Sequence, residues 1–363
     1  MRWLPIAAGV VFLLSLAWLE RGRALTGQND FAQLYAAARL AGTPDLYSRA
    51  ANLAAIQAIH GFTMESVVYT RPPFYAALLK PLASLPYLSA YALFSLATLS
   101  ALIWFFVRFG RECPSLPFFA AMSIPAVAAL CDGQDTPFLL AIVGATVLLM
   151  RRSRLFAAGL VLSLCAIKFH LFLFVPLALL LKRQWRVLAG GILGTALLSL
   201  LGVVVNGPDS LRRYVQVLRD PWINPSAATM PNLHGLVAVL HGDMRLELAL
   251  AGLVLLAFLW LAQRTGDLEL LLAASVVCGL LVSFHSGIAD DVLLFAVFVA
   301  VIGRSVNVPL RAAAALILTP VPYFLVLGGA PWSALFVVGL LALLATFCIS
   351  LWPVGLEAAP DGI

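Results

Sequence analysis

Charged side chains are scarce in this sequence. Only 11% of its 363 residues are Asp, Glu, Lys or Arg, whereas 62% are hydrophobic. A soluble globular protein carries about 25% charged residues, so this chain has too little polar surface to cover a particle in water. Its high hydrophobicity also excludes an intrinsically disordered chain. The composition therefore predicts a protein that resides in a lipid bilayer.

Cysteine is scarce as well, and no cysteine pair has metal-ligand spacing. The five cysteines are scattered, odd in number and mostly within apolar runs, so we interpret them as small core residues. The net charge is +6, but most Lys and Arg residues stand in short clusters between apolar runs, which is typical of cytoplasmic membrane loops. P-loop and dinucleotide fingerprints are missing too. We therefore expect no cofactor and no nucleic-acid partner. No metal is required either, although carboxylates at several turns leave metal dependence open.

Apolar runs long enough to cross a membrane recur along the chain. A spanning helix needs about 20 apolar residues. The first run, 3–19, is followed by charged residues without an adjacent small-x-small cleavage site, so we expect a retained helix and not a signal peptide. The partly apolar segment 74–85 is either part of a span or an interfacial helix. The remaining candidates are 86–107, 116–130, 137–150, 155–167, 169–181, 187–205, 246–262, 268–284, 292–303, 310–327 and 332–352.

These runs predict one all-α transmembrane domain, 1–363, with about 12 spanning helices. Two long loops, 20–85 and 206–245, interrupt them, and the first contains two predicted short helices, 31–41 and 49–60. With the N-terminus in the cytoplasm, both long loops are extracytoplasmic. The short outside loops then hold almost no Lys or Arg apart from Lys168, and the two long outside loops, which do carry basic residues, are only weakly bound by the positive-inside rule. The inside loops hold Arg108, Arg111, Arg151, Arg152, Arg154, Lys182, Arg183, Arg186, Arg264, Arg304 and Arg311.

The unusual polar residues gather at the other, extracytoplasmic face. An ionisable group at membrane depth is costly unless it faces a cavity or a partner, so this one-sidedness predicts a water-accessible site where lipid meets the outer solvent. We expect the site to draw on the two long loops and on three short turns. Its candidate residues are Asp30, Arg71, Gln134, Lys168, His170, His234, His285, Asp290 and Asp291.

Each of these residues also has an ordinary structural explanation. Asp30 could simply cap the helix that follows it, and Asp290-Asp291 could sit at a helix N-terminus for its dipole. Lys168 could extend to the headgroups, and residues 132–135 could form a plain turn. His285 closes an apolar run and could be an interface histidine. The sequence alone leaves these alternatives open.

Two segments of the first loop resemble glycosyltransferase family 87. The stretch 27–31 reads Gly-Gln-Asn-Asp-Phe, and it continues through Tyr35 and Arg39 to Gly42, Pro44 and Tyr47 as in that family's first-loop signature. The stretch 69–74 reads Tyr-Thr-Arg-Pro-Pro-Phe, which is similar to the family's aromatic-x-x-Pro-Pro approach to its second span.

Three later turns resemble the same family in the same order. Residues 133–135 are similar to its Gly-Gln-Asn turn, 166–168 to its Ala-x-Lys-Pro turn, and 283–285 with the following Asp290-Asp291 to its Ser-Pro-His…Tyr-Asp turn. The chain departs from the pattern at Asp135, Phe169, Phe284 and the Asp290-Asp291 pair. The resemblance as a whole spans roughly residues 27 to 295.

The resemblance implies a GT-C fold and an enzyme that uses a polyprenyl-phosphate sugar, usually mannose, with inversion to an α-mannosyl product. It implies that Asp30 is the catalytic base and that His285 is the family's later histidine. A phosphate leaving group needs fixed positive donors, for which Arg71, Lys168 and His285 are candidates. Gln134, His170, His234, Asp290 and Asp291 complete the expected substrate site.

The expected partners are the polyprenyl-phosphate sugar donor, a glycolipid or glycan acceptor, and membrane lipids. The expected location is a bacterial inner or plasma membrane, with the site on the extracytoplasmic face. The main alternative is a polytopic transporter or flippase. Such a protein places polar residues near the membrane midplane on broken helices in repeated halves, and the sequence shows no repeat of this kind.

Overall fold

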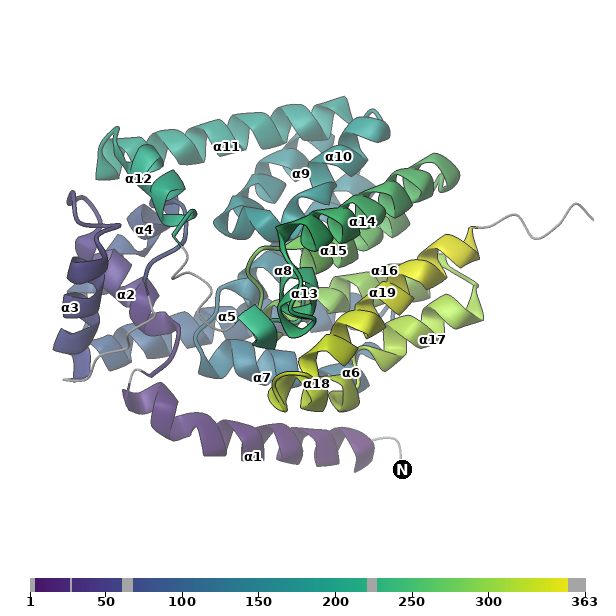
Figure 1. Cartoon of the computed structure of the whole chain (residues 1–363), viewed down its shortest axis with the longest axis horizontal. Coiled ribbons are helices and arrows are strands. Elements are labelled where there is room, and N and C mark those ends of the chain that lie inside the picture. The colour runs from purple at the N-terminus through teal and green to yellow at the C-terminus, as the bar shows by residue number, and fades with distance from the viewer. Residues whose placement is uncertain (1–3, 27, 61–67, 221–226, 352–363) are drawn as a thin grey trace, which may run out of the picture.

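The computed structural model describes residues 4–26, 28–60, 68–220 and 227–351, and every regular element in these ranges is helical (Figure 1). The elements of the first half are α1 (Leu4–Thr26), α2 (Phe31–Leu40), α3 (Arg49–His60), α4 (Pro73–Leu79), η1 (Lys80–Ser84), α5 (Tyr87–Gly110), α6 (Leu116–Ala120), α7 (Ile124–Cys131), α8 (Thr136–Arg151), α9 (Leu155–Leu162), η2 (Ser163–Phe172) and α10 (Phe174–Leu181). Those of the second half are α11 (Trp185–Asn206), α12 (Ser210–Val217), η4 (Ala227–Thr229), α13 (Leu233–Val239), α14 (Met244–Arg264), α15 (Leu268–Val282), η5 (Ile288–Leu293), α16 (Leu294–Arg304), α17 (Val308–Leu316), α18 (Pro320–Leu327) and α19 (Ser333–Ser350).

Five helices of the described residues are long and apolar enough to cross a membrane, and a bent pair raises the number to six. They are α5, the stretch Leu155–Phe172 formed by α9 and η2, α11, α14 and α19, with α17 and α18 as the bent pair. Several predicted runs, such as those of α8 and α15, form shorter apolar helices. The chain is therefore a polytopic, all-helical membrane protein, and the number of twelve spans stays a prediction.

The backbone leaves the helical region inside one predicted span and at one predicted turn. The predicted run 310–327 consists of α17 and α18, which meet at an angle of 47°. Pro320 begins α18, and the residue before a proline is disfavoured in helical conformation. The other break lies at Lys168, at the turn predicted between the runs 155–167 and 169–181, and its φ of −126° and ψ of 59° interrupt η2. This second break turns the chain at a polar residue between two apolar runs and is important for the site below.

Helix α11 packs very closely against α9 through glycines. A Cβ atom on Gly159 would lie 2.0 Å from the Val187 carbonyl oxygen, and one on Gly190 would lie 2.1 Å from the Phe156 oxygen. A Cβ atom on Gly194 would likewise collide with the Ser163 side chain. Small residues allow helix backbones to approach closely where lipid removes the usual hydrophobic drive for association. The contact fixes the relative position of the two helices.

The C-terminal end of α11 is hydrogen-bonded to the first loop. Asn206 accepts a hydrogen bond from the Gly42 amide at 2.8 Å and donates one to the Pro73 carbonyl oxygen at 2.9 Å. Near this end Gly202 lies against Phe74, where a Cβ atom would be 2.9 Å from the Phe74 nitrogen. Figure 1 shows α2, α3 and α4 together at this end of the molecule, with α12 beside them.

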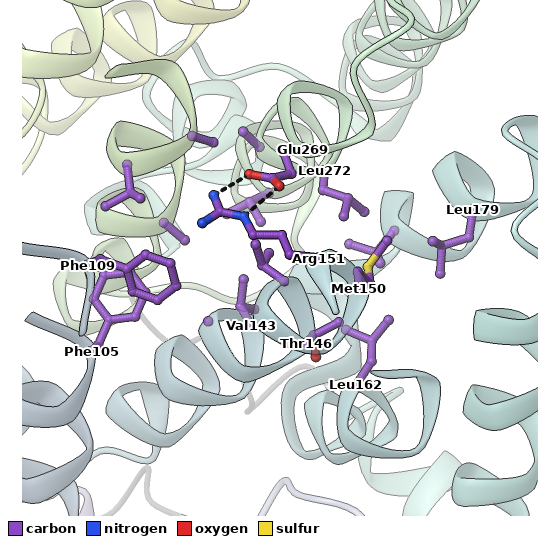
Figure 2. A pocket seen from close by; sticks show the side chains of 18 residues that line it. Phe105, Phe109, Val143, Thr146, Met150, Arg151, Leu162, Leu179, Glu269 and Leu272 are labelled. Atoms are coloured by element: carbon purple, nitrogen blue, oxygen red, sulfur yellow. Dashed lines mark hydrogen bonds and ion pairs between the residues drawn. The ribbon is translucent and has the colours of Figure 1, made fainter. Parts of the chain in front are cut away.

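The opposite end carries the basic helix termini that the sequence assigns to the cytoplasm. Arg151 at the end of α8 pairs with Glu112 and with Glu269 at the start of α15, each at 2.6 Å. Arg304 at the end of α16 also pairs with Glu269. Figure 2 shows the Arg151–Glu269 pair beside an apolar cavity of about 50 Å³ that is lined by side chains such as Phe105 and Phe109. Apart from Thr146 and this ion pair, its lining is apolar, so we assign this small cavity to the packing of the helices.

Candidate functional site

The N-terminus of α2 rests on the turn at residues 132–135. The Phe31 amide donates a hydrogen bond to the Asp132 carbonyl oxygen at 2.9 Å. Gly133 in this turn has a φ of +63°, and a Cβ atom there would lie 2.6 Å from the Phe31 Cβ. Glycine is therefore required both by the left-handed backbone and by the close approach. This contact brings Asp30 directly beside the turn.

Asp30 does not cap the helix that it precedes. It occupies the N-cap position of α2 without a side-chain cap hydrogen bond. Its Oδ2 instead accepts a hydrogen bond from Nε2 of Gln134, and the side chain is half-buried. The capping explanation for Asp30 is therefore wrong, and the carboxylate is directed into the protein towards the turn.

Lys168 connects this turn to the later loop. Its Nζ lies 2.8 Å from Gln134 Oε1, 2.6 Å from Asp290 Oδ1, 3.0 Å from Asp135 Oδ1 and 3.1 Å from Thr136 Oγ1. The side chain is only 2% exposed, which contradicts an extension to the headgroups. The backbone break at Lys168 allows its side chain to leave the apolar helix and enter this polar cluster.

Arg71 joins the cluster from the segment before α4. Its Nε donates to Asp135 Oδ2 at 3.0 Å, and one Nη donates to Thr70 Oγ1 at 3.2 Å. The Arg71 carbonyl oxygen accepts a hydrogen bond from the Tyr47 hydroxyl at 2.8 Å. A guanidinium has five N–H donors, so these two contacts leave donors for a further ligand.

The structure distinguishes the two adjacent aspartates. Asp290 Oδ1 also accepts a hydrogen bond from Thr136 Oγ1 at 2.8 Å, and its Oδ2 accepts one from the Gly287 amide at 3.0 Å. Asp291 is buried, and its Oδ2 has no hydrogen-bond partner among the described residues. Asp290 is thus the member of the pair that belongs to the cluster.

The carboxyl groups of the cluster differ in their protonation behaviour. Burial raises the pKa of Asp30, although Lys168 and Arg71 oppose the increase. Burial would also raise the pKa of Asp135 and Asp290, but the ion pairs with Arg71 and Lys168 hold both pKa values below the ordinary one. The Asp30 carboxylate accepts its hydrogen bond from the neutral Gln134 side chain, whereas Asp135 and Asp290 are paired with cations. It is therefore the most basic carboxylate of the three.

Three predicted histidines lie around the cluster in different ways. Burial and the charge of Arg71 lower the pKa of His285 to about 4, so its ring is neutral at pH 7. His170 is buried and packs its ring against Phe284, with centroids 4.8 Å apart. His234 lies 2.9 Å from Glu247 of α14 through its Nδ1. The Asn232 side chain, which donates to the Ser283 carbonyl oxygen and to Ser286, holds α13 against the loop that carries His285.

The structure thus joins Asp30, Gln134, Lys168, Asp290 and Arg71 in one network. His285 and His170 flank this network, Asp291 is buried beside it, and His234 is tied to α14. The expected set omitted Asp135 and Thr136, which bridge the two cations and Asp290. Their signal was present, because both stand in the same turn as Gln134. In the described ranges, no group of three His, Cys, Asp or Glu residues is arranged to hold a metal ion.

An apolar hollow begins next to this network. It has a volume of about 490 Å³ and lies between α11 and the segment made of α9, η2 and α10. Phe169, the neighbour of Lys168 in the chain, is part of its wall. Apart from Ser163, Cys165 and Thr195, its lining side chains are apolar. Through Phe169, this apolar wall adjoins in the chain the residue that carries one of the buried charges.

Comparison with protein-family models identifies a family for this chain. The model of glycosyltransferase family 87 matches residues 69–287, which is more than half of the chain. Arg71, Gln134, Lys168 and His285 lie inside the matched region, whereas Asp30 and Asp290 lie outside it. No curated protein and no solved structure was found to match the chain.

Proposed function

This chain belongs to glycosyltransferase family 87, and from this premise we propose that it transfers mannose from a polyprenyl-phosphate donor to an acceptor hydroxyl. The reaction inverts the anomeric carbon and takes place at the extracytoplasmic face of the membrane. The family assigns the chain to the membrane glycosyltransferases. The choice of mannose, of the lipid donor, of the GT-C fold and of the membrane side is part of the proposal.

The observation that carries this proposal is the position of Asp30. It is a half-buried carboxylate that is held by a neutral amide, and Gln134 alone separates it from Lys168. A general base must reach the proton that it removes, and its pKa should approach the working pH. Because burial raises the pKa of Asp30, this side chain is the best base that the described cluster offers.

In the proposed step, the acceptor hydroxyl oxygen attacks the anomeric carbon from the face opposite the phosphate. The new glycosidic bond forms while the bond from that carbon to the phosphate oxygen breaks. The hydroxyl proton moves to Asp30, and the electron pair of the broken bond leaves with the polyprenyl phosphate. A phosphate needs less acid assistance than the alcohol released from a glycoside, so one carboxylate is enough.

We assign the departing phosphate to Arg71 and His285. Arg71 is buried and keeps further N–H donors beyond its contacts with Asp135 and Thr70. His285 is neutral at pH 7 and offers an N–H group without a charge. Lys168 was also expected to bind the phosphate, and that role stays a prediction. Its contacts with Gln134, Asp290, Asp135 and Thr136 support a second role, which is to hold Gln134 in place for Asp30.

The apolar hollow beside Phe169 supports a lipid-linked donor. Its volume of about 490 Å³ lies within the range of about 300–1,000 Å³ of typical ligand pockets. A polyprenyl chain bound there would bring its phosphate towards Lys168 and Arg71, because Phe169 follows Lys168 directly. A soluble sugar nucleotide would gain nothing from this wall of Leu, Val and Phe side chains.

The test is sugar transfer by the purified protein with a panel of polyprenyl-phosphate sugars and a mixture of membrane glycolipids. Asp30→Asn should abolish transfer, because the amide cannot accept the hydroxyl proton. The matched control is Asp267→Asn, which lies at the opposite end of the molecule and keeps its helix cap. Full turnover by Asp30→Asn removes Asp30 as the base. Movement of labelled donor across sealed vesicles without a covalent product would favour the transporter instead.

A further inference from the structure

A second hollow lies at the same end of the molecule as the network but on its outer surface. It is formed by residues 44–48 of the first loop and by α12 with the residues after it, and its volume is about 520 Å³. Figure 1 shows α12 next to α4, and residues of both long loops line the hollow. Nothing in the transfer step described above uses it.

The lining of this hollow is polar, in contrast to the wall beside Phe169. It includes the carboxylates of Asp45 and Asp220, the Gln216 amide and the Ser48 hydroxyl. Arg213 contributes too, and its guanidinium donates a hydrogen bond to the Pro44 carbonyl oxygen across the hollow. Carboxylates, amides and hydroxyls are the groups that bind a ligand rich in hydroxyls. Two carboxylates beside one guanidinium disfavour an anion such as a phosphate or a nucleic acid.

The hollow is connected to the network through Tyr47. Tyr47 lines the hollow, and its hydroxyl donates a hydrogen bond to the carbonyl oxygen of Arg71 at 2.8 Å. Its ring stacks on Tyr69 and packs against Tyr214 of α12, with centroids 5.8 Å and 5.7 Å apart. One tyrosine thus separates the hollow from the residue to which we assign the donor phosphate.

We propose that this hollow binds the acceptor, which is a saccharide chain of at least two units. The terminal unit places its hydroxyl at Asp30, and the following units lie in the polar hollow. The inference rests on the proposed function and narrows the acceptor to a glycan or to the sugar portion of a glycolipid. The volume suits a short oligosaccharide, because pockets of about 300–1,000 Å³ hold ligands of that size.

The first test measures binding without the donor. Calorimetric titration of the detergent-solubilised protein with manno-, gluco- and galacto-tetraoses should detect binding of at least one of them. The double variant Asp45→Ala/Gln216→Ala should weaken this binding by about tenfold or more. Loss of the neutral Gln216 hydrogen bond should weaken binding by somewhat less than tenfold, and loss of a hydrogen bond to the charged Asp45 carboxylate should weaken it further. Both side chains are exposed, so the variant should keep its melting temperature.

The control is Arg212→Ala, on the same helix but directed away from the hollow, with its side chain 72% exposed. It should bind the oligosaccharides like the wild type. In transfer assays with octyl glycosides, the double variant should raise KM for a trisaccharide acceptor by about tenfold and leave KM for the monosaccharide acceptor unchanged. Such a split is expected of a remote acceptor subsite and not of a general loss of structure.

The outcomes separate the two proposals. Wild-type protein that binds no tetraose, or a double variant that binds as well as the wild type, overturns the acceptor hollow. Transfer that still depends on Asp30 would then leave the proposed function intact. Conversely, oligosaccharide binding that depends on Asp45 and Gln216, in a protein that transfers no sugar from any polyprenyl phosphate, refutes the proposed donor reaction.

Discussion

Substitution of Lys168 by methionine tests the charge balance of the buried network. Lys168 lies 2.6 Å from Asp290 and 3.0 Å from Asp135, and all three side chains are at most 4% exposed. Together with Arg71 it offsets these two carboxylates. Methionine keeps an unbranched chain of similar length but removes the charge, so two buried carboxylates then share the guanidinium of Arg71.

The cost of this change follows from protonation. Without Lys168, one carboxyl group must take up a proton in the folded protein. At pH 7 this means protonating a group whose unfolded pKa is about 3.9, and roughly three pKa units at 1.36 kcal/mol each give about 4 kcal/mol. A loss of stability of similar size, about 3–5 kcal/mol, is typical when one partner of a buried ion pair is removed. The melting temperature should fall by on the order of 5–10 °C.

The pH dependence of the loss has a definite sign. In the variant, the folded protein holds a proton that the unfolded chain releases above about pH 4, so stability falls as the pH rises from there. The deficit relative to the wild type should therefore shrink from about 4 kcal/mol at pH 7 to about 1.5 kcal/mol at pH 5. The change should also be rescued by Asp290→Asn in the same chain, since this second substitution removes the unpaired carboxylate.

Thermal unfolding of the detergent-solubilised protein, followed by tryptophan fluorescence at both pH values, measures these effects. The control is Lys80→Met, because Lys80 is exposed at the surface. If Lys168→Met melts within a degree of the wild type at pH 7, or if its deficit is equal at pH 5, then Lys168 does not neutralise buried carboxylates.

Three further predictions concern the proposed reaction. Arg71→Lys keeps the charge but loses the planar fork, so KM for the donor should rise about 10- to 100-fold in steady-state kinetics, and an unchanged KM would contradict phosphate binding by Arg71. Gly133→Ala places a Cβ atom 2.6 Å from Phe31 Cβ at a φ of +63°, so both melting temperature and kcat should fall, the stability by about 1–3 kcal/mol. Because Asp30 must be ionised to act as a base and burial raises its pKa, the transfer rate should increase with pH through a midpoint above the ordinary value of 3.8, and a rate that stays constant down to pH 4 would indicate another base.

Much of the architecture could be predicted from hydrophobic patterning. The predicted helix 49–60 coincides with α3, and the predicted helix 31–41 differs from α2 by one residue. The long uninterrupted runs also form helices, because apolar side chains and satisfied backbone groups are what lipid requires. The break at Lys168 falls at a predicted turn, whereas the break before Pro320 lies inside the predicted run 310–327. Periodicity carries no signal for where a helix bends inside an apolar run.

The candidate site could be predicted in part. The sequence places Asp30, Gln134, Lys168 and Asp290 at turns of one face, and the structure brings these turns together. The sequence could not show that Arg71 pairs with Asp135 and not with solvent, because the direction in which a turn residue points depends on tertiary contacts. For the same reason, the choice between Asp290 and Asp291 required coordinates.

Helix α11 connects distant parts of the molecule as a stiff rod. Its glycines fix it to α9 near Gly190. Its last residue, Asn206, hydrogen-bonds to the backbone of Gly42 and of Pro73, and Arg71 lies between these two residues in the chain. Sixteen residues of helix separate the two attachments, roughly 24 Å at about 1.5 Å per residue. A methyl group added to Gly190, deep in the apolar bundle, should therefore tilt the rod and displace a guanidinium that it never touches. Inherited or engineered substitutions at such remote glycines should therefore cause catalytic defects, although none of the reacting residues is substituted.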